Sequence, residues 1–270
     1  MARLDPTVEN HARQAIMDFL ARRRLRTGAR KVWLVSYPRS GSTLLRQYFS
    51  ILQGCAQLSV YPDDVVSAKS FAITHALGDV PLVKSHQMPK DDGAMIYLVR
   101  DGRNATLSFL YMTFLFGGHR FSELSEVYDG IRRLDETEGR WADHVAQAHE
   151  QSKTRRMLFV RYEDLVADPA ASLVQMARFM DGNISSEVAN ECVRRQRATD
   201  DYAQNPYNGY TYQPTKGSIY DLLKRNRRGD YWRDIFDDQS KRYFHQSGGT
   251  RWLLQFGYEQ AADWWAREAR

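Results

Sequence analysis

Short apolar runs alternate along this chain with longer segments in which apolar residues recur every three or four positions. The runs predict four buried strands at 31–37, 81–85, 95–99 and 157–161. The longer segments predict helices at roughly 10–52 (a range that also contains the first strand), 64–77, 103–116, 123–150, 170–180 and 185–196. Strands that alternate with helices predict an α/β fold, a single domain over 1–270 with a central parallel sheet flanked by helices.

The first strand ends in a short polar loop, and a helical pattern follows this loop. The loop at 38–43 has the sequence PRSGST, and the helical pattern after it continues to Gly54. A strand, a tight loop and a helix N-terminus form an anion site, because the N–H groups of the first helical turn have no partner within the helix. Arg39 adds a permanent charge, and Ser42 and Thr43 add hydroxyl donors. The segment predicts a P-loop-like site for phosphate or a similar oxyanion, and a plain helix-capping loop is the alternative.

Two more polar groups follow predicted strands. Lys84 and His86 are two positions apart at the end of the second strand, so their side chains leave the same face. A histidine takes up a proton near neutral pH, and a neighbouring cation stabilises developing negative charge. Arg100 ends the third strand and Ser108 lies in the helix after it, where they offer a second phosphate a charge and a hydroxyl. A structural histidine and surface arginines beside a capped helix remain the alternatives.

The net charge of +5 favours anionic ligands, but the lysines and arginines are scattered, so the composition does not indicate a nucleic acid partner. Cys55 and Cys192 lie in no metal-binding pattern, which argues against a disulfide framework or a structural zinc site. No apolar run is long enough to span a bilayer, and the N-terminus lacks the apolar core of a signal peptide. These features predict a cytoplasmic protein with no membrane partner, and they leave the oligomeric state open.

Three segments outside the strand pattern have predicted roles. Residues 1–30 are expected to form an N-terminal helix. Residues 197–232 contain several tyrosines among Asn, Gly, Pro and Gln without clear periodicity, which predicts a loop that closes over a ligand. A surface excursion without function is the alternative for this loop. The tryptophan-rich stretch at 252–265 predicts helix that packs on the core.

The oxyanion loop differs from the Walker A pattern GxxxxGK[ST] of P-loop NTPases. A single Gly41 follows Arg39 here, and no lysine comes after it. Such NTPases also supply a magnesium-binding carboxylate after an apolar strand, and the nearest candidate, Asp101, has Arg100 beside it. A kinase that uses ATP and magnesium is therefore an alternative that the loop disfavours. A non-catalytic nucleotide-binding protein is a second alternative, which the pairing of Lys84 with His86 disfavours.

Together, five segments resemble the sulfotransferases that use 3′-phosphoadenosine 5′-phosphosulfate (PAPS). YPRSGST at 37–43 resembles the 5′-phosphosulfate loop of that family, and KSH at 84–86 resembles its segment with a lysine and a catalytic histidine. Residues 100–108 resemble the 3′-phosphate segment, and FVRYEDL at 159–165 resembles a strand end whose tyrosine lies near the cofactor. RRGDYWRDIF at 227–236 resembles the segment that closes over the 3′-phosphate. Order and spacing agree from about residue 31 to residue 236.

The resemblance implies in-line transfer of a sulfuryl group from PAPS to a hydroxyl or amine of a small-molecule acceptor, which leaves 3′,5′-ADP. His86 would take the acceptor proton, Lys84 would stabilise the sulfuryl oxygens, and Arg39 would stabilise the bridging oxygen. No metal is implied, because fixed cations take the role of magnesium. The implied cofactor-binding residues are Arg39, Ser40, Gly41, Ser42, Thr43, Arg100, Ser108, Tyr162, Arg227, Arg228 and Gly229, with Arg225 as a further candidate for the 3′-phosphate.

Two positions depart from the family pattern. Arg39 stands where many cytosolic members have lysine. Because arginine does not lose its proton in a protein, Arg39 can neutralise charge on the leaving phosphate but is a doubtful proton donor. Leu44 replaces the aromatic residue that often stacks on adenine, so the adenine pocket has no assigned residue.

Overall fold

A computed structural model describes residues 31–53, 57–61, 80, 82–117, 125–199 and 230–266. The expected N-terminal helix, the expected helix at 64–77 and most of the expected loop at 197–232 lie outside these described residues. The same holds for four predicted nucleotide-binding residues, which are Arg225, Arg227, Arg228 and Gly229.

The centre of the fold is a parallel sheet of five strands in the order β2-β3-β1-β4-β5. The strands are β1 (Val32–Val35), β2 (Leu58–Ser59), β3 (Leu82–Ser85), β4 (Ala94–Val99) and β5 (Met157–Arg161). The prediction of a parallel sheet with four strands in these places is confirmed. The additional strand, β2, has two residues, which is too short to show any periodicity in the sequence.

Helices cover the sheet, and three of them lie close to the helices predicted at 103–116, 170–180 and 185–196. The helices are α2 (Ser42–Gln53), α3 (Gly102–Gly117), α4 (Ser125–Glu138), α5 (Trp141–Gln151), α6 (Tyr162–Ala167), α7 (Pro169–Phe179), α8 (Ser186–Thr199), α10 (Asp238–Gln246) and α11 (Gly249–Gln255), with short 3-10 helices η3 (Tyr231–Asp234) and η4 (Trp264–Ala266). The single helix predicted at 123–150 is wrong. Gly139 adopts a φ of +89° between α4 and α5, and this left-handed conformation ends the first helix.

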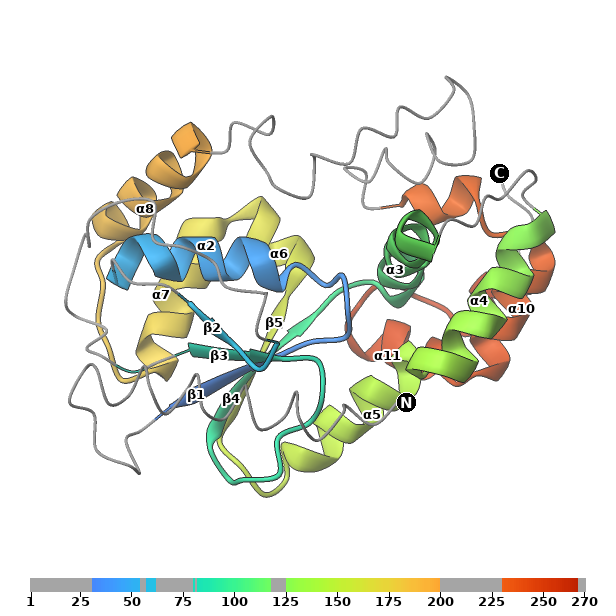
Figure 1. The fold of residues 1–270 in the computed structure, drawn as a ribbon, viewed down its shortest axis with the longest axis horizontal. Coiled ribbons are helices and arrows are strands. Elements are labelled where there is room, and N and C mark those ends of the chain that lie inside the picture. Colours follow the sequence, from blue (N-terminus) through green and yellow to red (C-terminus); the bar gives the residue numbers. More distant parts are fainter. Residues whose placement is uncertain are drawn as a thin grey trace.

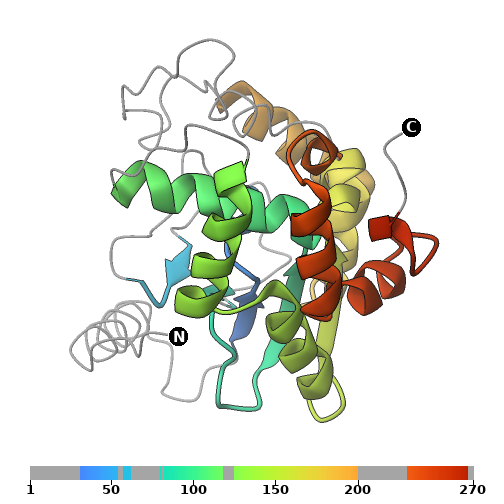
Figure 2. The same cartoon turned by 90° about the vertical axis from the view of Figure 1, so that its right-hand side faces the viewer.

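Side chains of the strands alternate between two chemically different layers. On β4, Ile96 and Leu98 pack with α2, α7 and α8, and we call the buried cluster on this face the aliphatic layer. Met95, Tyr97 and Val99 point to the opposite face and pack with α3, α4, α5, α10 and α11, which we call the aromatic layer. Figure 1 shows the two groups of helices on either side of the sheet, and Figure 2 looks onto the helices of the aromatic layer.

The C-terminal stretch completes the aromatic layer. Trp252, Leu253 and Trp264 are buried, as the prediction of a core-packing segment required. The Trp264 ring lies edge-on to that of Trp232, with 5.4 Å between their centroids. The described C-terminal stretch therefore packs against η3.

Candidate active site

The predicted site residues gather at the carboxyl ends of four neighbouring strands. Arg39 lies in the loop after β1, and His86 and Arg100 follow the strands on either side of it, β3 and β4. Tyr162 follows the next strand, β5. After β1 the chain forms β2 and β3 on one side of β1 and then places β4 on its other side, so the strand order reverses next to β1. Ligands of open parallel sheets bind at such a reversal.

The loop after β1 has the geometry of an anion site. The Ser40 N–H donates to the Tyr37 carbonyl at 3.3 Å, and the Leu45 N–H donates to the Gly41 carbonyl at 3.2 Å as the first turn of α2. The hydroxyl of Ser40 is buried and has no hydrogen-bond partner among the described residues. A buried hydroxyl without a partner at a helix N-terminus fits a bound oxyanion.

Gly41 is required by two features of this loop. Its φ is +99°, a conformation that disfavours any side chain. A Cβ at this position would also lie 2.4 Å from the ring of Tyr162. The tyrosine after β5 therefore packs directly on the anion loop.

Arg39 joins the loop to the segment after β4. Its φ of 67° is in the left-handed region, and its carbonyl accepts a hydrogen bond from Arg100 Nη1 at 2.9 Å. Its Nε donates to the hydroxyl of Ser108 at 3.2 Å. Arg39 and Ser108, which the sequence resemblance assigned to two different phosphates, are thus in direct contact.

Arg100 is buried between this loop and the end of β5. Its guanidinium lies over the Tyr162 ring, 4.7 Å from the centroid. This stacking and the bond to Arg39 hold its charge at the edge of the sheet beside the anion loop. Tyr162 thereby contacts both predicted anion-binding segments.

His86 is oriented by contacts of its ring and its backbone. Its Nδ1 lies 2.8 Å from the carbonyl oxygen of Ser36. Because a carbonyl oxygen only accepts, Nδ1 carries the proton and Nε2 is the basic nitrogen of the neutral ring. The His86 N–H donates to the Tyr61 hydroxyl at 3.3 Å, and the Lys84 ammonium lies over the Tyr61 ring, 5.4 Å from the centroid.

Asp101, the magnesium ligand that a kinase would need, is engaged by an arginine. Its carboxylate accepts from the backbone N–H of Arg103 at 2.9 Å, from Nε at 3.0 Å and from Nη2 at 2.6 Å. The Arg103 guanidinium lies over the rings of Trp232 and Trp264, 3.7 Å and 4.6 Å from their centroids. This carboxylate therefore fixes the guanidinium that packs on two tryptophans of the aromatic layer, and the arrangement disfavours the kinase alternative.

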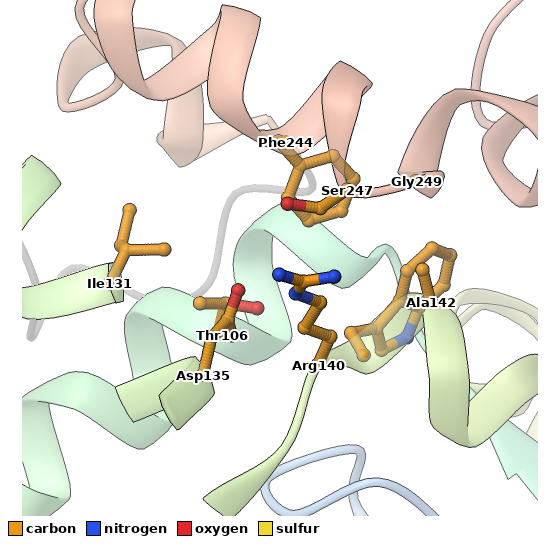
Figure 3. Close-up of a pocket in the computed structure, with 9 residues that line it drawn as sticks. Thr106, Ile131, Asp135, Arg140, Ala142, Phe244, Ser247 and Gly249 are labelled. Atoms are coloured by element: carbon orange, nitrogen blue, oxygen red, sulfur yellow. The ribbon is translucent and has the colours of Figure 1, made fainter. Parts of the chain in front are cut away.

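A separate small pocket lies within the aromatic layer (Figure 3). It is lined by Thr106, Ile131, Asp135, Arg140, Trp141, Ala142, Phe244, Ser247 and Gly249. Burial raises the pKa of Asp135 to about 6, although the nearby Arg140 opposes the shift. None of the predicted site residues lines this pocket.

Sequence reasoning missed several residues that shape the site. Ser36 holds the histidine ring through its carbonyl, and Tyr61 contacts both Lys84 and His86. A backbone carbonyl has no sequence signature, and Tyr61 lies in a short segment without periodicity. Among the described residues, no cluster of three or more His, Cys, Asp or Glu side chains could hold a metal ion.

Comparisons with known proteins agree with this geometry. The sulfotransferase domain family matches residues 67–248, which is more than half of the chain. Sulfotransferase 1E1 of Mus musculus is 24% identical over 177 residues, which cover 61% of this chain and 59% of that protein. Sulfotransferase 1E1 of Homo sapiens is 21% identical over 228 residues, which cover 75% of this chain and 77% of that protein.

Solved structures share the fold. A retinol dehydratase in complex with androsterone and the inactive cofactor PAP matches with a TM-score of 0.55 and 18% identity, over 83% of this chain and 80% of that one. A mouse sulfotransferase complexed with PAP matches with a TM-score of 0.54 and 17% identity, over 89% of each chain. Within the described part of the chain, no helix has the length and apolar character to cross a membrane. The chain therefore belongs to the sulfotransferase domain family, and the sequence-based expectation of a PAPS-dependent sulfotransferase is confirmed.

Proposed function

We propose that His86 is the general base that takes the proton of the acceptor as the sulfuryl group is transferred. The observation that carries this role is the bond between Nδ1 and the Ser36 carbonyl, which leaves Nε2 as the basic nitrogen. Lys84 comes from the same strand end and stabilises negative charge on the sulfuryl oxygens. Both side chains come from the end of β3, which pairs with β1 and so lies next to the anion loop.

The loop after β1 would hold the 5′-phosphosulfate of PAPS, which supplies the sulfuryl group and the leaving 3′,5′-ADP. The amides of the first turn of α2 and the buried hydroxyl of Ser40 are the donors we assign to it, together with Ser42 and Thr43. Arg39 would neutralise charge on the bridging oxygen as the bond to sulfur breaks. Its permanent charge suits this role. The proton that the acceptor loses goes to His86.

The 3′-phosphate would bind beside the same loop, between Arg100 and Ser108. The contact between Arg39 and Ser108 supports two phosphate sites that lie directly beside one another. The predicted contacts of Arg227, Arg228 and Gly229 with this phosphate stay proposals from the resemblance. We propose that no metal is needed, because Arg39, Lys84 and Arg100 supply the positive charge.

The acceptor is proposed to be a small molecule with a hydroxyl or amine. Retinol dehydratase, which shares this fold and has been solved in complex with androsterone and with retinol, supports an acceptor with an apolar body and a hydroxyl group. In this chain the ring of Tyr61 lies 5.7 Å from that of His86 and offers an apolar surface next to the base. The acceptor would reach Nε2 from this side.

Transfer from labelled PAPS to a panel of small hydroxylated and amine acceptors, with and without EDTA, tests the proposal. We expect sulfated product in both conditions. The variant His86→Ala should lose about 10²–10⁴ in turnover and keep its affinity for 3′,5′-ADP, because a general base contributes that much to the rate. Arg100→Ala should instead weaken 3′,5′-ADP binding first. Normal turnover of His86→Ala would contradict the base assignment, and dependence on ATP and magnesium would favour a kinase.

A further inference from the structure

Behind His86, the buried Tyr97 and the partly buried His144 form a chain of hydrogen bonds that ends on its backbone. The Tyr97 hydroxyl lies 2.7 Å from His144 Nδ1, and His144 Nε2 lies 2.9 Å from the carbonyl oxygen of His86. Tyr97 is on β4 and His144 is on α5, so this chain links the sheet and a helix of the aromatic layer to the segment after β3.

The proton positions follow from the acceptor at the end of the chain. The His86 carbonyl only accepts, so His144 Nε2 carries a proton and donates it. The Tyr97 hydroxyl then donates to His144 Nδ1, which requires a neutral imidazole. Burial lowers the pKa of His144 to about 4 and raises that of Tyr97, so both groups stay neutral at physiological pH.

His86 is therefore held at three points. Its backbone N–H donates to the Tyr61 hydroxyl, its backbone carbonyl accepts from His144, and its ring Nδ1 donates to the Ser36 carbonyl. These three contacts fix both the peptide planes around the residue and the rotation of its ring. The direction of Nε2 follows from them.

We propose that His144 and Tyr97 are positioning residues for the transfer step: they fix the backbone of His86 so that Nε2 points at the acceptor. The inference rests on the proposed role of His86 as general base. A misplacement of a reacting group by about 1 Å can cost about 10²-fold in rate. Without the bond from His144, the His86 peptide can rotate and move Nε2, which should reduce turnover and leave nucleotide binding unchanged. The two side chains also pack on one another, with 5.6 Å between the ring centroids.

Three variants separate the hydrogen bonds from the packing. His144→Phe keeps an aromatic ring but removes the donor to the His86 carbonyl and the acceptor for Tyr97. His144→Gln places an amide N–H near the original Nε2 and should restore the donor. Tyr97→Phe removes only the hydroxyl. The matched control is His149→Phe on the same helix, whose ring packs on Trp252 with 5.3 Å between centroids.

Turnover with saturating PAPS, 3′,5′-ADP affinity and the ¹⁵N NMR shifts of the His86 ring are measured for each variant. We expect His144→Phe to lose about 10- to 100-fold in kcat with 3′,5′-ADP affinity nearly unchanged, His144→Gln to recover most of the loss, and Tyr97→Phe to lose less than His144→Phe. The wild type should show one tautomer of His86 with the proton on Nδ1, and His144→Phe should show a mixture. The control should match the wild type in all three readouts.

Full turnover and an unchanged His86 spectrum in His144→Phe would overturn the inference. If His144→Phe does not fold, the His86 spectrum and the kcat of Tyr97→Phe decide, because that variant keeps both rings: a wild-type spectrum with full turnover would overturn the inference. Failure of the proposed function looks different: His86→Ala would then turn over normally, whatever the variants at 97 and 144 do to the spectrum.

Discussion

The two faces of the sheet differ in chemistry although the same strands supply both. The aliphatic layer is built mainly from Leu, Ile, Val and Met side chains of the sheet and of α2, α7 and α8. The aromatic layer buries Tyr, Trp and Phe side chains, among them Tyr97, Trp141 and Trp264. Both layers bury their apolar side chains almost completely.

The difference determines which layer is coupled to the site. Two hydrogen bonds join the aromatic layer to the segments after β1 and β3. The Tyr37 hydroxyl, after β1, donates to the carbonyl of Gly139, and His144 Nε2 on α5 donates to the carbonyl of His86, after β3. In the aliphatic layer, the thiol of Cys192 on α8 donates to the Tyr48 carbonyl on α2 at 3.3 Å, and neither residue is a predicted site residue. A change in the aliphatic layer away from the first turn of α2, on α7 or α8, should therefore alter stability alone, whereas a change in the aromatic layer should also alter pH dependence or ligand binding.

The largest effect is expected from Leu173→Ala in the aliphatic layer. Leu173 on α7 is completely buried, so its loss leaves a cavity and should cost about 2–5 kcal/mol of unfolding free energy. Urea denaturation at pH 5 and at pH 8 should give the same loss, and the folded variant should keep its affinity for 3′,5′-ADP. A loss that differs between the two pH values would break the distinction between the layers.

Asp135→Asn should have the next largest effect, and its sign depends on pH. The folded-state pKa of Asp135 is about 6, above its ordinary value of 3.8, because burial disfavours the carboxylate. The folded protein thus holds a proton that the unfolded chain has already lost near pH 5, and its stability falls as the pH rises through about 6. Asparagine cannot ionise, so the variant should gain at most about 3 kcal/mol at pH 8 and nothing near pH 3.

Thermal unfolding of the wild type and Asp135→Asn across this pH range checks the expectation. The neutral amide can still accept the hydrogen bond from Tyr243 that the carboxylate accepts. Leu173→Ala is the matched control, because its melting temperature should shift by the same amount throughout. A constant gain for Asp135→Asn would show that the benefit comes from packing and not from the lost charge.

Gly102→Ala should have the third largest effect and should destabilise the protein, because Gly102 lies where the aromatic layer meets the site. A Cβ there would lie 2.3 Å from the ring of Trp141, which is buried against the start of α3. Overpacking of this kind costs about 1–3 kcal/mol, and a shift of α3 would also move Ser108 and weaken 3′,5′-ADP binding. Gly139→Ala is the control: its Cβ meets open space at a φ of +89°, so it should cost about 1–2 kcal/mol of stability and leave binding unchanged.

Much of this arrangement follows from the sequence because the strands of a parallel sheet are buried on both faces. The continuous apolar runs identified β1, β3, β4 and β5, and the rule that such strands share one carboxyl edge brought together the segments that begin with Arg39, His86, Arg100 and Tyr162. Short elements escaped detection. The two-residue β2 has no measurable period, and Gly139 breaks a pattern that otherwise continues from α4 into α5.

The finer contacts of the site depend on packing between distant segments. Tyr97 and His144 are 47 positions apart, and Arg39 and Ser108 are 69 apart. Which of them meet depends on how α5 and α3 sit on the sheet, and apolar periodicity does not specify such contacts. The sequence therefore indicated the edge of the sheet and its chemistry, whereas the tautomer of His86 required the structure.

The smallest effect is expected from Cys192→Ser, which probes whether the aliphatic layer is insensitive to pH. Burial raises the pKa of the Cys192 thiol to about 12, so below pH 8 it is protonated in the folded protein, and mostly so in the unfolded chain. A serine hydroxyl can still donate to the Tyr48 carbonyl, so the change should cost about 1 kcal/mol or less. Denaturation at pH 6 and at pH 8 should give equal losses. A loss that grows with pH would mean that a charge elsewhere is coupled to this layer, and the contrast with the aromatic layer would then be one of degree.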